Sequence, residues 1–434
     1  MGNSPRATSL PPQSLPVFRS EQFIVVSGAN IGDTLSFAED LALDDVYCLE
    51  KGAPARLSIL PETRSKARIA PDTEVGLAGI CIEDTAFPTG EPYEFDLAVE
   101  RMRAAADAAI LRLEEGVRDI EFDTAHLAAD VIFRTLFSMP ITEARAEAVF
   151  AAFQSYQRMQ PLLSPAALLG LWRFWPKRAG RRGARQAAII RELLGSLVAE
   201  RAKAISAGTA PNDLATQIMT CMDPETGKGL DQQGMIDQVA IFFLAGHETS
   251  ASALAWTLYL LAMFPDWQDK LAAEAKALDA GCDFKVMSKL RLSRDVFREA
   301  LRLYPPVPMM VRESTCPENF RGRAIKPGAQ VVISPWHLHR HTRLWDNPDG
   351  FDPTRWATEN GKQCMRDAFI PFSSGPRVCT GAGFAMVEGP LLLSMLVRNF
   401  RFETTERTPV PVAHLTVRSK DGIWLKISKR TDDA

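Results

Sequence analysis

Apolar residues recur three and four positions apart along most of the chain beyond residue 95, which is the spacing of amphipathic helices. One stretch, 231–264, is unusually long for a helix in a globular protein. The other helical stretches lie at 95–115, 123–137, 142–159, 185–205, 213–222, 266–278, 288–303 and 382–400. The pattern therefore predicts a mainly helical protein.

The regions between and beside these helical stretches have a different pattern. A Pro-Gly turn within 322–334 leads into the β-rich run 329–334, and 400–403 and 422–427 are typical of short strands. Near the N-terminus, 23–26 could form a strand, while 53–92 has little periodicity. Residues 1–16 are polar and rich in proline and serine, which predicts a disordered tail.

Composition and charge narrow the class of protein. The chain has 434 residues, of which 46% are hydrophobic and 24% charged, and its formal net charge is −3. These values are ordinary for a soluble globular protein and give no sign of a nucleic-acid partner. No run of 18 apolar residues occurs, so 251–264 is interpreted as a buried core helix.

The cysteines indicate a reducing compartment. All seven are widely spaced, and none forms a C-x-x-C pair. No secretory signal opens the chain. We therefore expect a cytoplasmic protein without a disulfide framework.

The most specific chemistry lies in the motif Phe372-Ser-Ser-Gly375-Pro-Arg377-Val-Cys379-Thr-Gly381. Cys379 lies in a tight loop before the helical stretch 382–400, where the helix dipole and free N–H groups favour a thiolate. The two glycines let the backbone turn and approach a large flat group, and the arginine supplies a permanent charge. A lone cysteine here is usually a small core residue, but the whole pattern indicates a ligand.

This motif resembles the haem-ligand loop of the cytochromes P450, which are haem-thiolate monooxygenases. The resemblance implies that Cys379 ligates the iron of haem b, with Phe372, Gly375 and Gly381 beside the cofactor. It also implies the cytochrome P450 fold, mainly α with small peripheral β-sheets, as a single domain over residues 17–434. Residues 17–94 are atypical, because they lack the tryptophan and the basic helix that the family carries there.

A second motif, Ala-Gly-His-Glu-Thr-Ser at 245–250, interrupts the long apolar stretch. Gly246 costs about 1 kcal/mol in a helix relative to alanine, and a threonine can bond back to the carbonyl four residues earlier. The motif resembles the oxygen-binding groove of the family. The resemblance implies that Ala245 and Gly246 leave room for O₂, that Glu248 relays protons and that Thr249 stabilises the oxygen. Read alone, the acid–alcohol pair could equally be a cap or a solvent-facing pair.

Charged residues elsewhere match two further features of the family. Glu299 and Arg302 share one helix face, a spacing that is also common in surface ion pairs. With Arg355 they resemble the buried network that holds the haem-ligand loop in place. The resemblance further implies that Arg312 and Arg377 pair with the two haem propionates. A surface arginine is the alternative interpretation of Arg312.

The resemblance implies a pocket for a hydrophobic small molecule, lined by Phe242, Phe243, Val307, Met309 and Leu415. The expected reaction is hydroxylation of a fatty acid, terpenoid or similar compound with O₂. Electrons would come from a separate ferredoxin or flavoprotein, and we expect a monomer. The alternatives are a peroxygenase or isomerase on the same fold, and a non-catalytic or impaired haem or ligand binder.

Two other segments have alternative interpretations. Residues 162–185 are apolar and then basic, and correspond in position to the mobile lid of the family. Such a segment could make a peripheral membrane contact or be a solvated basic loop. His337, His339 and His341 alternate like metal ligands on a strand, but they lie in a stretch that resembles a loop of the family. His247 is interpreted as a structural residue or a pocket wall.

Overall fold

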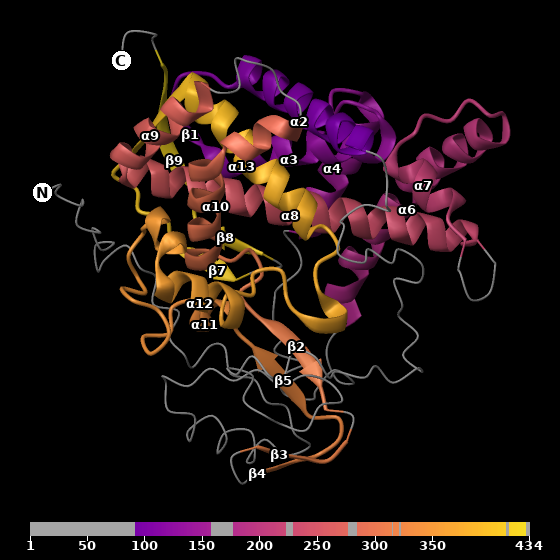
Figure 1. The fold of residues 1–434 in the computed structure, drawn as a ribbon. Coiled ribbons are helices and arrows are strands. Elements are labelled where there is room, and N and C mark those ends of the chain that lie inside the picture. Colours follow the sequence, from indigo (N-terminus) through magenta and orange to yellow (C-terminus); the bar gives the residue numbers. More distant parts are fainter. Residues whose placement is uncertain are drawn as a thin grey trace, which may run out of the picture.

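The structure is a computed structural model that describes residues 92–157, 177–222, 229–276, 284–314, 316–320, 323–413 and 416–430. The predicted tail, the strand at 23–26, nearly all of the atypical segment 17–94 and the apolar part of 162–185 lie outside the described residues. Leu415 also lies outside them. In the described part, helices form the main body and paired strands extend from one side of it (Figure 1).

Helices account for most of the described residues. They are α2 (Pro92–Arg112), α3 (Ile120–Phe137), α4 (Ala144–Gln157), α6 (Lys177–Ser206), α7 (Leu214–Thr220), α8 (Gln232–Met263), α9 (Pro265–Ala275), α10 (Arg291–Leu303), α11 (Pro335–Leu338), α12 (Glu359–Asp367) and α13 (Ala382–Asn399). Short 3₁₀ helices are η4 (Phe284–Lys289), η5 (Pro353–Ala357) and η6 (Gly375–Arg377).

The strands form small antiparallel sheets. They are β1 (Gly116–Asp119), β2 (Met310–Glu313), β3 (Glu318–Phe320), β4 (Arg323–Ile325), β5 (Gln330–Ile333), β6 (Phe400–Thr404), β7 (Pro411–Ala413), β8 (Val417–Ser419) and β9 (Trp424–Lys429). One sheet has the order β1-β9-β6, and the other strands pair as β2–β5, β3–β4 and β7–β8. Met310 of β2 lies opposite Ile333 of β5, and Met310 and Arg312 line the site described below.

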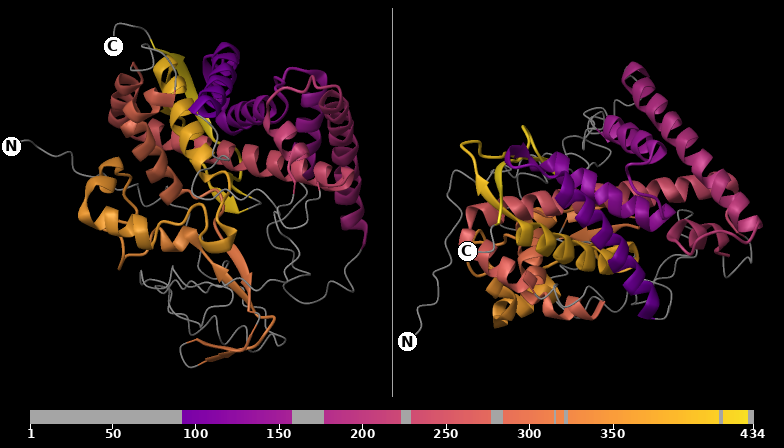
Figure 2. Two further views of the ribbon diagram at one scale, coloured as in Figure 1. Left: turned by 45° about the vertical axis from the view of Figure 1, so that its right-hand side comes forward. Right: turned by 90° about the horizontal axis from the view of Figure 1, so that it is seen from above.

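The long helix α8 runs through the core (Figure 2), and it is packed against α3, α6, α7, α9, α10 and α13. Its N-cap is Asp231, whose carboxylate accepts a hydrogen bond of 2.7 Å from the Gly234 N–H. Trp256 in its apolar second half is fully buried and stacks on Tyr304 with a ring separation of 4.2 Å. This packing fixes α8 against the end of α10.

Helix α13 packs closely against α10 because it carries a glycine at the contact. A Cβ atom at Gly389 would lie 2.3 Å from the ring of Phe297. Since Phe297 is 2% exposed, its ring cannot move away into solvent. The helix that follows the cysteine loop is therefore held against the core.

The expected mainly helical fold with small sheets is confirmed. One boundary was wrong: 177–184 were assigned to a lid, but α6 continues back to Lys177. Alanine, arginine and lysine are good helix formers, so the basic run extends the helix. Helix α12 lies outside the stretches predicted to be helical. It buries only Gly361 and Cys364, and so shows little apolar periodicity. The predicted strands at 329–334, 400–403 and 422–427 correspond to β5, β6 and β9. The remaining strands have three or four residues each and show no readable alternation.

None of the helices in the described ranges combines the length and the apolar character that a membrane crossing would need.

Candidate functional site

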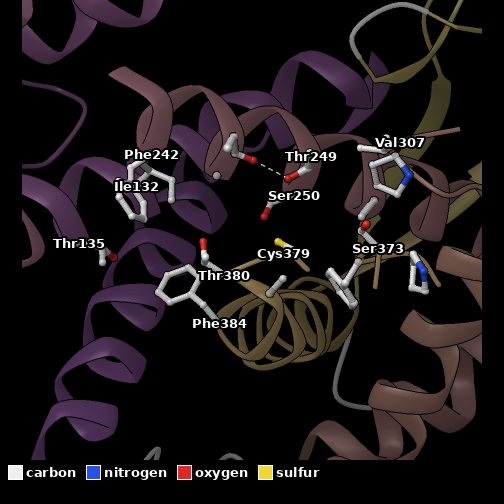
Figure 3. A pocket seen from close by; sticks show the side chains of 18 of the residues that line it. Ile132, Thr135, Phe242, Thr249, Ser250, Val307, Ser373, Cys379, Thr380 and Phe384 are labelled. Atoms are coloured by element: carbon white, nitrogen blue, oxygen red, sulfur yellow. Dashed lines mark hydrogen bonds between the residues drawn. The ribbon is translucent and has the colours of Figure 1, made fainter. Parts of the chain in front are cut away.

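A cavity of about 550 Å³ lies in front of the Cys379 sulfur. Its walls come from α3, α7, α8, α10, β2 and the loop 371–381 that leads into α13. This volume is within the range of small-molecule and cofactor sites. In Figure 3, Thr249 and Ser250 on α8 lie on one side of the cavity, and Cys379, Thr380 and Phe384 lie on the other.

The loop around Cys379 is shaped by its glycines and by a backbone hydrogen bond. Gly375 has φ +69°, a left-handed conformation that favours glycine. The Cys379 N–H donates to the Phe372 carbonyl over 2.8 Å, which closes the loop. Gly381 has φ −87°, so glycine is not required there for the turn. A Cβ atom at this position would instead lie 3.9 Å from the Cys379 Sγ, at the side of the sulfur.

The protein environment of Cys379 disfavours a free thiolate. Although the sulfur opens onto the cavity, burial raises the pKa of the Cys379 thiol above its ordinary value. A hydrogen bond with the backbone of Gly381 only partly opposes this effect. The backbone N–H at the helix N-terminus thus favours the thiolate as expected, but burial outweighs it. A metal cation at the sulfur would supply the missing stabilisation, since a coordinating thiol is deprotonated.

A buried charged network lies behind the loop. Glu299 accepts hydrogen bonds from Arg302 Nη2 over 2.8 Å and from Arg355 Nε over 3.1 Å, and the three side chains are at most 5% exposed. Arg302 also donates to the carbonyls of His339 and Gly350, over 2.9 Å each. The network thus ties α10 to the segment between α11 and η5.

His339 extends this network to the cysteine loop. Its Nε2 accepts a hydrogen bond of 2.9 Å from the Ile370 N–H, just before the loop begins. Burial and the nearby charges of Arg302 and Arg340 lower the pKa of His339 to about 3. The imidazole is therefore neutral at physiological pH, which leaves Nε2 free to accept. Within the described residues, no cluster of histidine, cysteine or acidic side chains is arranged to hold a metal ion.

Helix α8 contributes small and hydroxylated residues to the cavity. Ala245, Gly246, Thr249 and Ser250 all line it. The Thr249 hydroxyl donates to the Ala245 carbonyl over 2.7 Å (Figure 3). A Cβ atom at Gly246 would lie 2.5 Å from the Cδ1 atom of Ile132. The absence of a side chain at Gly246 therefore lets Ile132 of α3 pack directly against α8.

Glu248 does not face the cavity. It is 2% exposed, and its Oε1 accepts hydrogen bonds from Arg418 Nε over 2.7 Å and from the Thr416 hydroxyl over 2.8 Å. Burial acts to raise the pKa of Glu248, but Arg418, His247 and Thr416 outweigh it and the pKa lies below its usual value. The carboxylate is therefore ionised at neutral pH. Its Oε2 has no hydrogen-bond partner among the described residues.

His247 lies in the core beside Glu248. Its ring stacks on Phe243 with a centroid separation of 4.8 Å, and burial lowers its pKa. Its Nδ1 lies 3.1 Å from the Phe243 carbonyl, a contact that assigns the proton to Nδ1. The side chain is thus a packing element of α8.

Two arginines reach the cavity from different elements. Arg312 on β2 donates from Nη2 to the Ser373 hydroxyl over 3.0 Å, and Arg377 lies in the cysteine loop. The structure thus brings two permanent cations to one apolar cavity.

The predicted wall residues divide into two groups. Phe242 and Val307 line the cavity, whereas Phe243 and Met309 are buried elsewhere. Met310, the next residue along the chain, lines the cavity in place of Met309. Met309 precedes β2, whereas Met310 and Arg312 lie two positions apart on β2 and both line the cavity, as expected for one face of a strand.

A family model described as "Cytochrome P450" matches residues 94–427. The chain belongs to the cytochrome P450 family. The crystal structure of the cytochrome P450DA heme domain superimposes with a TM-score of 0.67 at 26% identity, covering 78% of this chain and 74% of that one. The cytochrome P450 fold expected from the sequence is therefore confirmed.

Curated relatives agree with this assignment. Cyclooctat-9-en-7-ol 5-monooxygenase from Streptomyces melanosporofaciens is 32% identical over 297 residues, which are 67% of this chain and 62% of the relative. Cytochrome P450 4V2 from Homo sapiens is 28% identical over 359 residues, which are 76% of this chain and 68% of the relative. The match thus spans less than two thirds of the length of the first of these relatives.

The cavity of this cytochrome P450 fits a haem. The cysteine sulfur opens onto it, its walls are mostly apolar, and small residues of α8 leave space on the facing side. Arg312 and Arg377 offer a guanidinium group to each of two carboxylates. The donor set thus matches a flat, apolar, anionic macrocycle that contains a thiolate-bound metal.

Sequence reasoning missed one buried acid beside the cavity, Glu388 of α13. Its carboxylate Oε2 accepts a hydrogen bond of 2.6 Å from the Ser250 hydroxyl, which lines the cavity. The available signal was an acid within the apolar stretch 382–400, the same kind of signal that drew attention to Glu248.

Proposed function

We propose that this cytochrome P450 is a haem-thiolate monooxygenase that inserts one atom of O₂ into a hydrophobic small molecule and reduces the other atom to water. The observation that carries the proposal is that the Cys379 sulfur opens onto an apolar cavity lined on α8 by Ala245, Gly246 and Thr249. The monooxygenase name of the first relative described above supports the same reaction class.

The chain's residues hold and orient the cofactor in this proposal. Cys379 binds the iron of haem b as a thiolate, while Arg312 and Arg377 neutralise the two propionates. Haem bound in this way supplies the activation of O₂. The network of Glu299, Arg302 and Arg355 keeps the cysteine loop at a fixed distance from α8.

The acid and the alcohol on α8 have separate tasks. The Thr249 hydroxyl lies at the cavity and can donate a hydrogen bond there when it leaves the Ala245 carbonyl. Glu248 is the proposed proton relay. Because it is bonded to Arg418 and Thr416, its carboxylate must exchange these partners before it can deliver a proton to the cavity.

The apolar walls of the cavity favour a fatty acid, a terpenoid or a similar substrate. The names of two relatives, a cyclooctat-9-en-7-ol 5-monooxygenase and a cyclooctatin synthase, support a cyclic hydrophobic compound. We further propose a single domain over 17–434, a monomer, a cytoplasmic location and electron supply by a separate ferredoxin or flavoprotein.

The spectrum of the reduced, CO-bound protein tests the proposal. Thiolate ligation gives a red-shifted Soret band, which we expect in the unmodified protein and not in Cys379→His. Cys221 also lines the cavity, so Cys221→Ser is the matched control and should keep the band. Retention of the band in Cys379→His would show that another residue is the ligand. Incorporation of isotope from labelled O₂ into a hydrophobic product tests the reaction class.

A further inference from the structure

Arg418 of β8 faces two glutamates that come from different helices. Its Nε donates to the Oε1 atom of Glu248 on α8 over 2.7 Å. Glu121, on the first turn of α3, binds the next residue of β8, because its Oε1 accepts a hydrogen bond of 2.8 Å from the Ser419 N–H. The charges of both carboxyl groups act on the arginine. The guanidinium group is thus hydrogen-bonded to one acid while a second acid lies beside it.

The second acid, Glu121, is an unusually weak acid for a glutamate. Burial raises the pKa of Glu121 to about 7, and the negative charges of Asp119 and Glu248 act in the same direction. The Ser419 N–H and the positive charge of Arg418 only partly oppose this shift. Glu121 therefore changes its charge near neutral pH, whereas Arg418 holds Glu248 ionised there.

Other charged groups around Glu121 are paired with one another, neutral or exposed. Asp123, one half-turn further along α3, pairs with Arg112 of α2 at 3.1 Å and with Arg118 of β1 at 3.0 Å. Helix α7, which also packs against α3, has no charged residue. The remaining groups nearby are His247 of α8, which is buried with a lowered pKa, and the exposed Lys420 and Asp421 that follow β8. Among the described residues, Arg418 is thus the cation that responds to the charge of Glu121.

We propose that Glu121 is a positioning residue that sets, through Arg418, how tightly Glu248 is held away from the cavity. The inference rests on the proposed function, in which Glu248 relays protons. While Glu121 is neutral, Arg418 is hydrogen-bonded to Glu248 as in the structure. When Glu121 releases its proton to solvent, the new carboxylate competes for the same guanidinium group, whose side chain is 32% exposed and has room to move.

The charge of Glu121 also acts on Glu248 directly. A second negative charge nearby disfavours the ionised form of a carboxyl group, and a weaker bond to the arginine does the same. Both effects make it easier for Glu248 to take up a proton once Glu121 is ionised. By thermodynamic reciprocity, Glu248 must influence the ionisation of Glu121 to the same extent. This reciprocity provides a test that needs no turnover.

Infrared spectroscopy of the haem-loaded protein measures this coupling. The neutral carboxyl group of Glu121 gives a C=O band that shifts in heavy water and should fade as pH rises through about 7. Glu121→Gln should remove this band while it keeps a carbonyl acceptor for the Ser419 N–H. Glu248→Gln should move the titration to lower pH, because it removes a negative charge and frees Arg418. Glu115→Gln is the matched control and should change neither, since Glu115 is exposed and accepts its hydrogen bond of 2.8 Å from the Lys429 N–H instead.

Product formed per NAD(P)H consumed, measured against pH, provides the second arm. This coupling should rise as pH increases through about 7 in the unmodified protein, because Glu248 is then held less tightly. Glu121→Gln should lose the rise, and Glu121→Asp should restore part of it. When Arg418→Gln is already present, Glu121→Gln should have no further effect, because the two residues act as one unit.

Three outcomes would overturn the inference. In the first, Glu121→Gln removes no carboxyl band. In the second, Glu248→Gln leaves the titration of that band unchanged, and in the third, Glu121→Gln keeps the rise in coupling. Absence of the thiolate Soret band in the unmodified protein would instead refute the proposed function, and the infrared titration would still decide the inference.

Discussion

Removal of the Glu299 carboxylate should destabilise the whole haem domain. Its Oε1 and Oε2 accept hydrogen bonds from Arg302 at 2.8 and 3.1 Å, from Arg355 at 3.1 Å and from the Asp352 N–H at 3.2 Å. Glu299→Ala leaves two guanidinium charges buried without a counter-charge. Breaking a buried ion pair in this way typically costs ~3–5 kcal/mol.

That cost is a large part of the ~5–15 kcal/mol that stabilises a typical protein. At about 1.4 kcal/mol for each factor of ten, the unfolded fraction should rise on the order of 10²–10⁴-fold. We therefore expect little soluble, haem-loaded Glu299→Ala protein. Glu299→Gln keeps one carbonyl acceptor, so its yield of soluble, haem-loaded protein should lie between those of the unmodified protein and Glu299→Ala. The assay is denaturant unfolding followed by circular dichroism, together with the haem content of the purified protein.

A surface ion pair provides the control for this experiment. Glu359 lies 2.7 Å from Lys362, but its side chain is 92% exposed, so Glu359→Ala should unfold at the same denaturant concentration as the unmodified protein. If Glu299→Ala is soluble, haem-loaded and equally resistant to denaturant, then the network does not hold the loop. A variant that merely turns over more slowly would point to a catalytic role for Glu299 instead.

Three further predictions concern α8 and α13. Thr249→Ala should keep haem and substrate binding but lower the product formed per NAD(P)H consumed, and unchanged coupling would refute its role. The raised pKa of Glu388 means that the folded protein holds this proton more tightly than the unfolded chain. The contribution of Glu388 to the free energy of unfolding should be fully present below about pH 4.5 and should fall by about 3 kcal/mol as pH rises to about 7. Unfolding measurements at several pH values should find a smaller pH dependence of this free energy in Glu388→Gln. Gly389→Ala places a methyl group 2.3 Å from the Phe297 ring and should cost about 1–3 kcal/mol in the same unfolding assay, whereas an unchanged midpoint would show that the ring can move.

The sequence by itself determined the family, most of the long helices and the cysteine ligand loop. These features depend on local patterns: apolar spacing over ten or more residues, and the motif from Phe372 to Gly381. The same reasoning selected Thr249, Arg312 and Arg377, all of which line the cavity. It could not assign β1, β3, β4, β7 or β8, because a strand of three or four residues is too short for its pattern to repeat.

Tertiary structure alone decided which side chains meet. Glu248 and Glu388 are both acids within apolar helices, yet Arg418 turns one away from the cavity while Ser250 brings the other toward it. Likewise, the placement of β2 decides that Met310, its first residue, lines the cavity while Met309, just before the strand, does not. Partners such as Ser250 and Glu388, 138 positions apart, are chosen by how helices pack, and no local pattern carries that information.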